Sequence, residues 1–72
     1  MAIDIVSLTD KGWELSKSTR HNGDADSWSV IFFLGRMNGK STADRIAQYT
    51  FGGDLMRTNN VIRKLRVSGI VY

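Results

Sequence analysis

Hydrophobic and polar positions change their period along the chain, and these changes divide it into short segments. Residues 3–8, IDIVSL, are rich in β-branched and aliphatic residues in a near-alternating order, which is typical of a short strand. Farther on, apolar residues recur every three or four positions, as they do on one face of a helix. The pattern predicts strands over residues 3–8 and 70–72 and helices over about 10–18, 27–37, 41–49 and 54–67.

Polar residues that can cap a helix stand before each predicted helix. The candidate N-caps are Thr9, Asp26 or Ser27, Ser41, and Asp54. Ser41 is followed three residues later by Asp44, a spacing that resembles a capping box. Gly69 is suited to end the last helix in a left-handed conformation, and residues 70–72 then continue as a strand that can pair with residues 3–8.

The most apolar stretch, WSVIFFLGRM over residues 28–37, fits either a buried helix or a central strand, because periodicity does not separate the two in a short run. A helix is favoured, because a cap residue precedes the stretch and one face carries Trp28, Ile31, Leu34 and Gly35. Phe32 falls off that face, and an exposed Phe32 beside Phe33 would indicate a dimer contact.

The last helix has an amphipathic pattern. Its expected inward stripe is Leu55, Thr58, Ile62 and Leu65. Arg57, Asn59, Asn60, Arg63 and Lys64 would then project outward or to the flanks. The helix therefore offers a polar, basic surface over an apolar one.

Composition narrows the class of protein. A chain of 72 residues with 42% apolar and 24% charged residues is expected to fold as one small domain, residues 1–72, without a large catalytic cleft. The chain has no cysteine and a single histidine, His21, so thiolate and histidine metal clusters are excluded and no cofactor is expected. The longest apolar run is far shorter than the ~20 residues of a membrane span, and a cytoplasmic location is expected.

Charge is distributed unevenly along the chain. Residues 1–35 hold three Lys or Arg against five Asp or Glu, a net −2, whereas residues 36–72 hold seven against two, a net +5. This asymmetry indicates a C-terminal half that faces an acidic partner, although a solvated helix face is the simpler alternative.

Enzymatic activity is not expected. GRMNGKS, residues 35–41, resembles a phosphate-binding loop, but three residues separate its glycines where four are needed. Asp24 and Asp26 are better explained by loop polarity and helix capping than by a metal or acid–base site.

Residues 41–71, STADRIAQYTFGGDLMRTNNVIRKLRVSGIV, resemble the helix-turn-helix core of winged-helix transcription regulators. In that superfamily an IA-like pair precedes a recognition helix that ends in the pattern L-x-x-L-x-x-x-G-[LI]-V. The matching positions are Ile46, Ala47, Ile62, Leu65, Gly69, Ile70 and Val71. Residues 6–15, VSLTDKGWEL, are similar to the LTxxG junction that MarR and PadR regulators carry after the wing, although here it stands at the N-terminus.

The resemblance implies a mainly α fold with a small β element, a winged-helix-type helix-turn-helix whose wing is reduced or formed with the N-terminal strand. It also implies a small transcription regulator that binds double-stranded DNA in a sequence-specific way. Side-chain chemistry assigns base reading to Arg57, Asn59, Asn60 and Arg63. Phosphate contacts are assigned to Lys40, Ser41, Thr42, Arg45, Lys64 and Arg66.

Two alternatives stay open at this point. The same fold could serve as a protein-binding module of a larger assembly, or the basic face could bind RNA. A DNA-binding protein should gather its cations on one face, whereas an interaction module should expose an apolar patch around Phe32, Tyr49 or Tyr72. A homodimer would improve specificity for DNA, and nothing in the sequence indicates a small-molecule effector.

Overall fold

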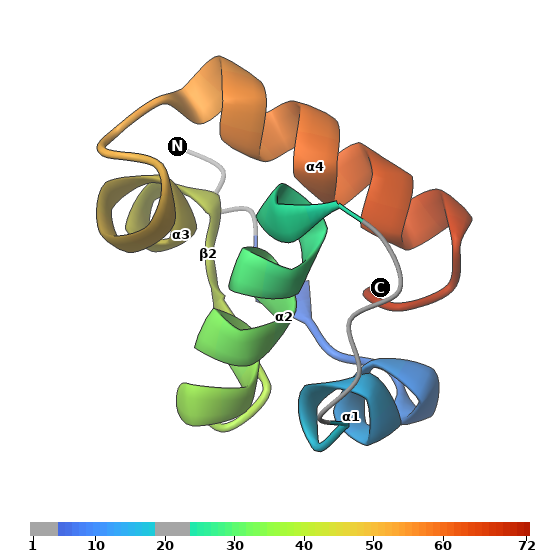
Figure 1. Ribbon diagram of the computed structural model, residues 1–72. Coiled ribbons are helices and arrows are strands. Elements are labelled where there is room, and N and C mark those ends of the chain that lie inside the picture. The colour runs from blue at the N-terminus through green and yellow to red at the C-terminus, as the bar shows by residue number, and fades with distance from the viewer. Residues whose placement is uncertain (1–4, 19–23) are drawn as a thin grey trace.

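Four helices and two short strands make up the part of the chain that the computed structural model describes, residues 5–18 and 24–72. The elements run in the order β1 (Ile5–Ser7), α1 (Asp10–Ser16), α2 (Ala25–Arg36), β2 (Lys40–Thr42), α3 (Ala43–Thr50) and α4 (Leu55–Val67). Figure 1 shows α4 lying across the top of the molecule, with the other three helices beneath it. The expected mainly helical fold with a small β element is confirmed.

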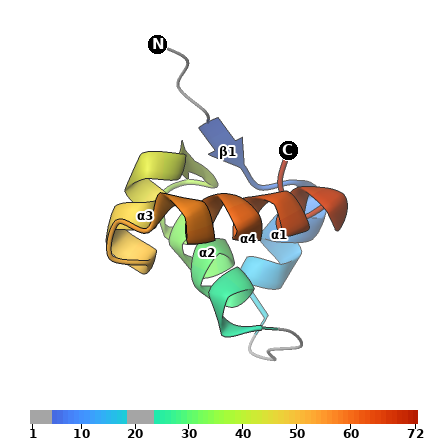
Figure 2. The ribbon, with the colours of Figure 1, turned by 90° about the horizontal axis from the view of Figure 1, so that it is seen from above.

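The N-terminal strand lies between β2 and the last residues of the chain. β1 pairs with β2 in antiparallel register, with Val6 opposite Ser41. On its other edge, Leu8 forms an isolated bridge with Val71, and the Tyr72 N–H donates to the Ser7 carbonyl over 2.9 Å. Figure 2 shows the C-terminus beside β1. The predicted pairing of the two chain ends therefore exists, but as one bridge, and residues 70–72 form no strand of their own.

The hydrophobic core lies between the sheet and helices α2, α3 and α4. Its buried apolar residues are Val6, Leu8, Trp28, Val30, Ile31, Leu34, Ile46, Ala47, Val61, Ile62, Leu65 and Val71. One polar side chain, Thr58, is fully buried among them, and its hydroxyl donates to the Asp54 carbonyl over 2.8 Å. That bond satisfies the hydroxyl inside the helix, so burying it costs little.

The LTDKG junction, residues 8–12, fastens the C-terminal turn to α1. The Thr9 hydroxyl donates to the Gly69 carbonyl over 2.6 Å, lies 3.0 Å from the Ile70 carbonyl, and accepts the Gly12 N–H as the N-cap of α1. A Cβ added at Gly12 would lie far inside van der Waals contact with the Ile70 carbonyl oxygen. Glycine is needed here because the two backbones approach closely.

The predicted start of the third helix is wrong. Ser41 does not cap it but lies in β2, and the cap is Thr42, whose hydroxyl accepts the Arg45 N–H. Both residues can cap a helix, and pairing with β1 decides between them, since extended residues 40–42 complete the sheet.

Two other boundaries differ from the prediction by two residues. α2 begins at Ala25 after the N-cap Asp24, two residues earlier than expected, because the Asp24 carboxylate accepts the Ser27 N–H. α1 ends at Ser16, two residues before its predicted end, whereas α4 begins at Leu55, directly after its predicted cap Asp54. Residues 3–4 of the predicted first strand lie outside the described residues, as do residues 19–23, which include His21.

Candidate nucleic-acid interface

Helix α4 buries three of the four residues predicted for its inward stripe, and one prediction, Leu55, is wrong. Thr58, Val61, Ile62 and Leu65 are its buried residues. Leu55, expected to face inward, is 44% exposed, and Val61 takes a place in the core instead. Leu55 lies in the first turn, directly after the tight Gly52–Gly53 turn and the N-cap Asp54.

The outer face of α4 carries polar and basic residues of its middle turns. At 100° per residue, Asn60 and Arg63 lie nearly opposite the buried stripe, and Asn59 lies beside them. All three are exposed. Arg63 has no ion pair within residues 5–18 and 24–72. Three of the four residues predicted to read bases therefore face solvent together.

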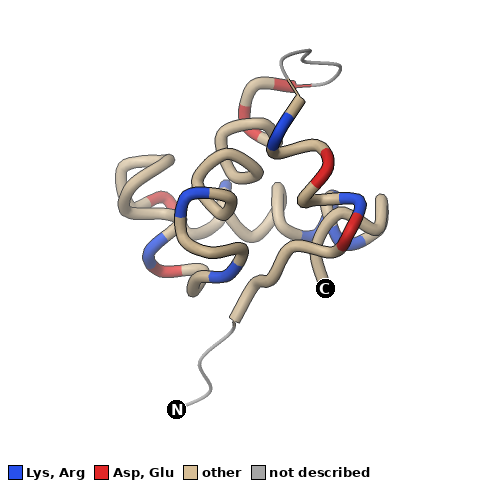
Figure 3. Tube along the Cα trace, turned by 90° about the horizontal axis from the view of Figure 1, so that it is seen from below, with Lys and Arg blue, Asp and Glu red and all other residues tan. Residues whose placement is uncertain are grey.

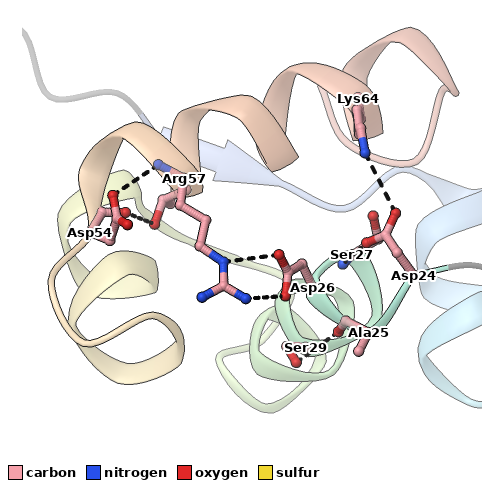
Figure 4. Close-up of polar contacts among 9 residues, drawn as sticks. Asp24, Ala25, Asp26, Ser27, Ser29, Asp54, Arg57 and Lys64 are labelled. Atoms are coloured by element: carbon pink, nitrogen blue, oxygen red, sulfur yellow. Dashed lines mark hydrogen bonds and ion pairs between the residues drawn. The ribbon is translucent and has the colours of Figure 1, made fainter.

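The side chain of Arg57, the fourth predicted base reader, points toward α2 and pairs with Asp26. Its Nε and Nη2 atoms donate to the two carboxylate oxygens of Asp26 on α2 over 2.9 and 2.6 Å, a two-pronged ion pair. The guanidinium also lies over the Phe51 ring, 4.9 Å from its centroid. Figure 4 shows the side chain reaching from α4 down to the first turn of α2.

Lys64 lies on the same flank of α4 as Arg57, seven residues or two turns farther on. Its Nζ atom is 3.7 Å from a carboxylate oxygen of Asp24, the N-cap of α2 (Figure 4). Both partners are exposed, so this contact is a weak one. The flank of α4 that faces α2 thus sets two cations against two carboxylates and presents little net charge.

Hydrogen bonds control the ionisation of these two carboxylates. The Ser27 backbone N–H holds the pKa of Asp24 below its ordinary value, with a smaller effect from Lys64. The hydrogen bond from Arg57 lowers the pKa of Asp26, and the same pair raises the pKa of Arg57. Both carboxylates are therefore charged at neutral pH, and they would repel a phosphate brought to this flank.

The residues predicted to contact phosphates differ in the exposure and the partners of their side chains. Lys40 on β2 and Arg45 on α3 are exposed, and within the described part of the chain neither has an acidic partner. The Thr42 hydroxyl caps α3 and can still donate a hydrogen bond. The Ser41 Oγ atom is buried and has no hydrogen-bond partner among the described residues, so it does not reach solvent.

Arg66 faces the end of the chain. Its Nε atom donates to the Tyr72 carbonyl over 2.8 Å, so this guanidinium holds the C-terminal residues against α4. Figure 3, which shows the molecule from below, has basic and acidic positions interspersed along the trace. The expected continuous basic face that would include Arg57 and Lys64 is not formed, because acidic residues of α2 interrupt it.

The sequence predicted only in part the aromatic surface that α2 and α3 form. Tyr49 is 72% exposed, and its ring stacks on Phe33 with centroids 5.8 Å apart. Phe32 is half-buried and contacts Trp28, so it is not the isolated exposed side chain that the sequence suggested. Tyr49 lies on the flank of α3, three residues after the buried Ile46, and helix periodicity alone does not show whether a residue on the flank is covered.

The described residues contain neither a cluster that could bind a metal ion nor a helix that could span a membrane. No group of three His, Cys, Asp or Glu side chains in residues 5–18 and 24–72 is arranged to hold a metal ion. Across the same residues, no helix has the length and apolar character needed to cross a bilayer. The cellular compartment stays a prediction.

Comparisons with known proteins do not assign this chain to a family. It matches no protein-family model, no curated protein and no solved structure. The geometry of the chain itself must therefore carry any conclusion about function.

Proposed function

We propose that this protein binds double-stranded DNA through α4, as a small transcription regulator that acts by occupying its site. The observation that carries the proposal is the outer face of α4, where Asn59, Asn60 and Arg63 are exposed together opposite a fully packed stripe. Asn pairs bidentately with adenine and Arg with guanine in the major groove, each worth ~1–3 kcal/mol of discrimination.

The connection between α3 and α4 supports this proposal. Residues 51–54 join the two helices, Gly52 and Gly53 adopt positive φ angles, and Asp54 then caps α4. A short helix, a tight turn and a longer basic helix are the parts of a helix-turn-helix, in which residues near the start of the second helix contact base edges.

The fold proposed for this site is a winged helix with a rearranged chain order. In MarR and PadR regulators the strand that leads into the LTxxG junction comes after the recognition helix. Here the equivalent strand, β1, is the first element, yet it lies beside Val71 and leads into Thr9 and Gly12, which hold the turn after α4. This arrangement supports the proposed winged helix, because β1 and the LTDKG junction lie beside the turn after α4 although they come first in the chain.

The role proposed for each residue of the site follows from the exposure of its side chain. Asn59, Asn60 and Arg63 are the proposed base readers, and Lys40, Arg45 and the Thr42 hydroxyl are proposed phosphate contacts. Arg57 and Lys64 can contribute only if they exchange Asp26 and Asp24 for DNA. Homodimerisation, which would place two such helices on one duplex, stays a prediction.

A fluorescence anisotropy titration with random-sequence duplex DNA at roughly 50 and 200 mM salt tests the proposal. The parent protein should bind at the lower salt and weaken steeply at the higher. Arg63→Gln should bind several-fold more weakly, because the outer face of α4 loses an exposed cation.

Arg36→Gln is the matched control, because it also removes one exposed positive charge but lies at the end of α2. Its affinity should stay close to that of the parent. Absence of binding at low salt by a folded parent protein, or an equal loss in the two variants, would contradict the proposal.

A further inference from the structure

Helix α2 is apolar on two sides. Its core side carries the buried residues Trp28, Val30, Ile31 and Leu34. Ser29, Phe32, Phe33 and Arg36 follow the i, i+3, i+4, i+7 spacing of a second face, whose two phenylalanines pack against the core and stay half-buried. The parts of these two rings that the core leaves uncovered are available to a further surface.

Neighbouring helices turn this outer face into a groove. Trp13 of α1 and Tyr49 of α3 flank Phe32 and Phe33, and the groove has a volume of about 810 Å³. Ser16 lies close enough to Gly35 for a tight approach of α1 to α2. Two of the flanking rings stack, since Tyr49 lies parallel to Phe33, and most of the Tyr49 side chain still faces solvent.

The groove is positively charged at its rim. Lys17 and Arg36 line it, and within residues 5–18 and 24–72 no acidic side chain does. Neither cation has an ion pair in that part of the chain. An occupant of the groove should therefore combine apolar side chains for the rings with carboxylates for the two cations.

A second copy of the chain fits this requirement poorly. A two-fold contact centred on the groove would set the same surface of both copies face to face. The Lys17 and Arg36 side chains of the two copies would then approach one another without a carboxylate in the groove to separate them.

We propose that this groove, formed by Trp13, Phe32, Phe33 and Tyr49 and flanked by Lys17 and Arg36, binds an acidic amphipathic helix of a partner protein. Docking would follow the helix-in-groove mode, with apolar anchors of the partner against the aromatic rings. The groove shares no residue with α4, so the partner and DNA can be bound together.

Titration of the isotope-labelled protein with a synthetic amphipathic peptide tests the proposal by nuclear magnetic resonance. The peptide carries Leu on one helical face and Glu on the other, and a matched peptide carries Gln in place of Glu. Trp13 lines the groove and Trp28 is buried in the core, so their two indole N–H signals report on groove and core separately. The Glu peptide should shift the Trp13 signal more than the Trp28 signal and bind several-fold more tightly than the Gln peptide.

Variants locate the binding surface. Tyr49→Ala should weaken binding of the Glu peptide about tenfold, as expected for a central aromatic anchor. Tyr72→Ala removes an equally exposed tyrosine, 74% against 72%, outside the groove and should leave the affinity unchanged. Replacing both Lys17 and Arg36 by Gln should remove the preference for the Glu peptide.

Four results would overturn the proposal. These are no binding of the Glu peptide, equal affinity for the Glu and Gln peptides, shifts confined to α4, and a Trp13 signal that moves with protein concentration alone. The last result would assign the groove to a second copy of this chain.

Discussion

Helix α4 is held firmly at its carboxyl end and left open along its outer face. After the last helical turn, Thr9 bonds to the Gly69 and Ile70 carbonyls, Gly12 packs against the Ile70 backbone, and the Lys11 Nζ atom donates to the Ser68 carbonyl. On the outer face, by contrast, Asn59, Asn60 and Arg63 project into solvent.

This difference separates structural from functional polar groups on the same helix. The groups at the carboxyl end bond to backbone carbonyls of residues 68–70, which follow the helix, so replacing them should change stability. The groups on the outer face contact nothing that holds the fold together, so replacing them should change binding alone. The flank with Arg57 and Lys64 is intermediate, because its ion pairs with α2 can be exchanged for another acidic partner.

The largest expected effect is on stability at the carboxyl end. Gly12→Ala should destabilise the fold by at least about 2 kcal/mol, because the new methyl group cannot fit against the Ile70 carbonyl. Urea unfolding followed by circular dichroism measures this. Gly35→Ala is the control, since its methyl group meets only the Ser16 side chain and the gain in helix propensity offsets the crowding. Equal losses in the two variants would contradict the close approach at Gly12.

Removal of the Thr9 hydroxyl should have the next largest effect. Thr9→Ala should cost about 1–2 kcal/mol in the same unfolding experiment, because the variant loses a helix cap and a donor to the Gly69 carbonyl. Thr42→Ala removes a cap without such a long-range bond and should cost about 1 kcal/mol or less. A larger loss at Thr42 than at Thr9 would show that the C-terminal turn is not held by this hydroxyl.

A smaller effect is expected on the intermediate flank. Asp26→Asn removes a negative charge beside α4 and leaves Arg57 without its ion-pair partner. Affinity for random duplex DNA should therefore rise about two- to threefold at low salt, and the gain should shrink as salt screens the charges. Anisotropy titration measures the change. Unchanged or weaker binding would show that Arg57 does not reach DNA.

The smallest effect is the pH dependence of the same ion pair. Because Arg57 lowers the pKa of folded Asp26 below 3.8, the pair stabilises the fold above that pH, and the contribution is lost as pH falls through the folded pKa. The urea midpoint of the parent should exceed that of Asp26→Asn at neutral pH, and the gap should close in acid. A double-mutant cycle with Arg57→Gln isolates the pair. A gap that persists in strong acid would contradict this account.

Local patterns in the sequence were sufficient to predict where the helices lie. Spacing of apolar residues placed all four, and the caps Thr9 and Asp54 were identified because capping depends on a few adjacent residues. Strand β2 was missed, because Ser41 and Thr42 both fit a helix start and only the distant β1 strand distinguishes them.

Long-range contacts limited the prediction of the site. The sequence identified Asn59, Asn60 and Arg63 as outward residues, since helix periodicity alone determines this. It did not reveal that Arg57 pairs with Asp26, 31 positions away, because side-chain partners across helices depend on how the helices pack. The exposure of Leu55 and the burial of Val61 were not predicted for the same reason.

The most direct test of the DNA-binding face is to follow the side-chain amide signals of asparagine while duplex DNA is added to the isotope-labelled protein. Asn59 and Asn60 lie on α4, and Asn38, in the turn before β2, is an exposed internal control. The Asn59 and Asn60 signals should shift at low salt, and by more than the Asn38 signal, because Asn38 lies outside α4 and two residues from the proposed phosphate contact Lys40. Shifts confined to Asn38, or none at DNA concentrations that saturate binding, would contradict this prediction.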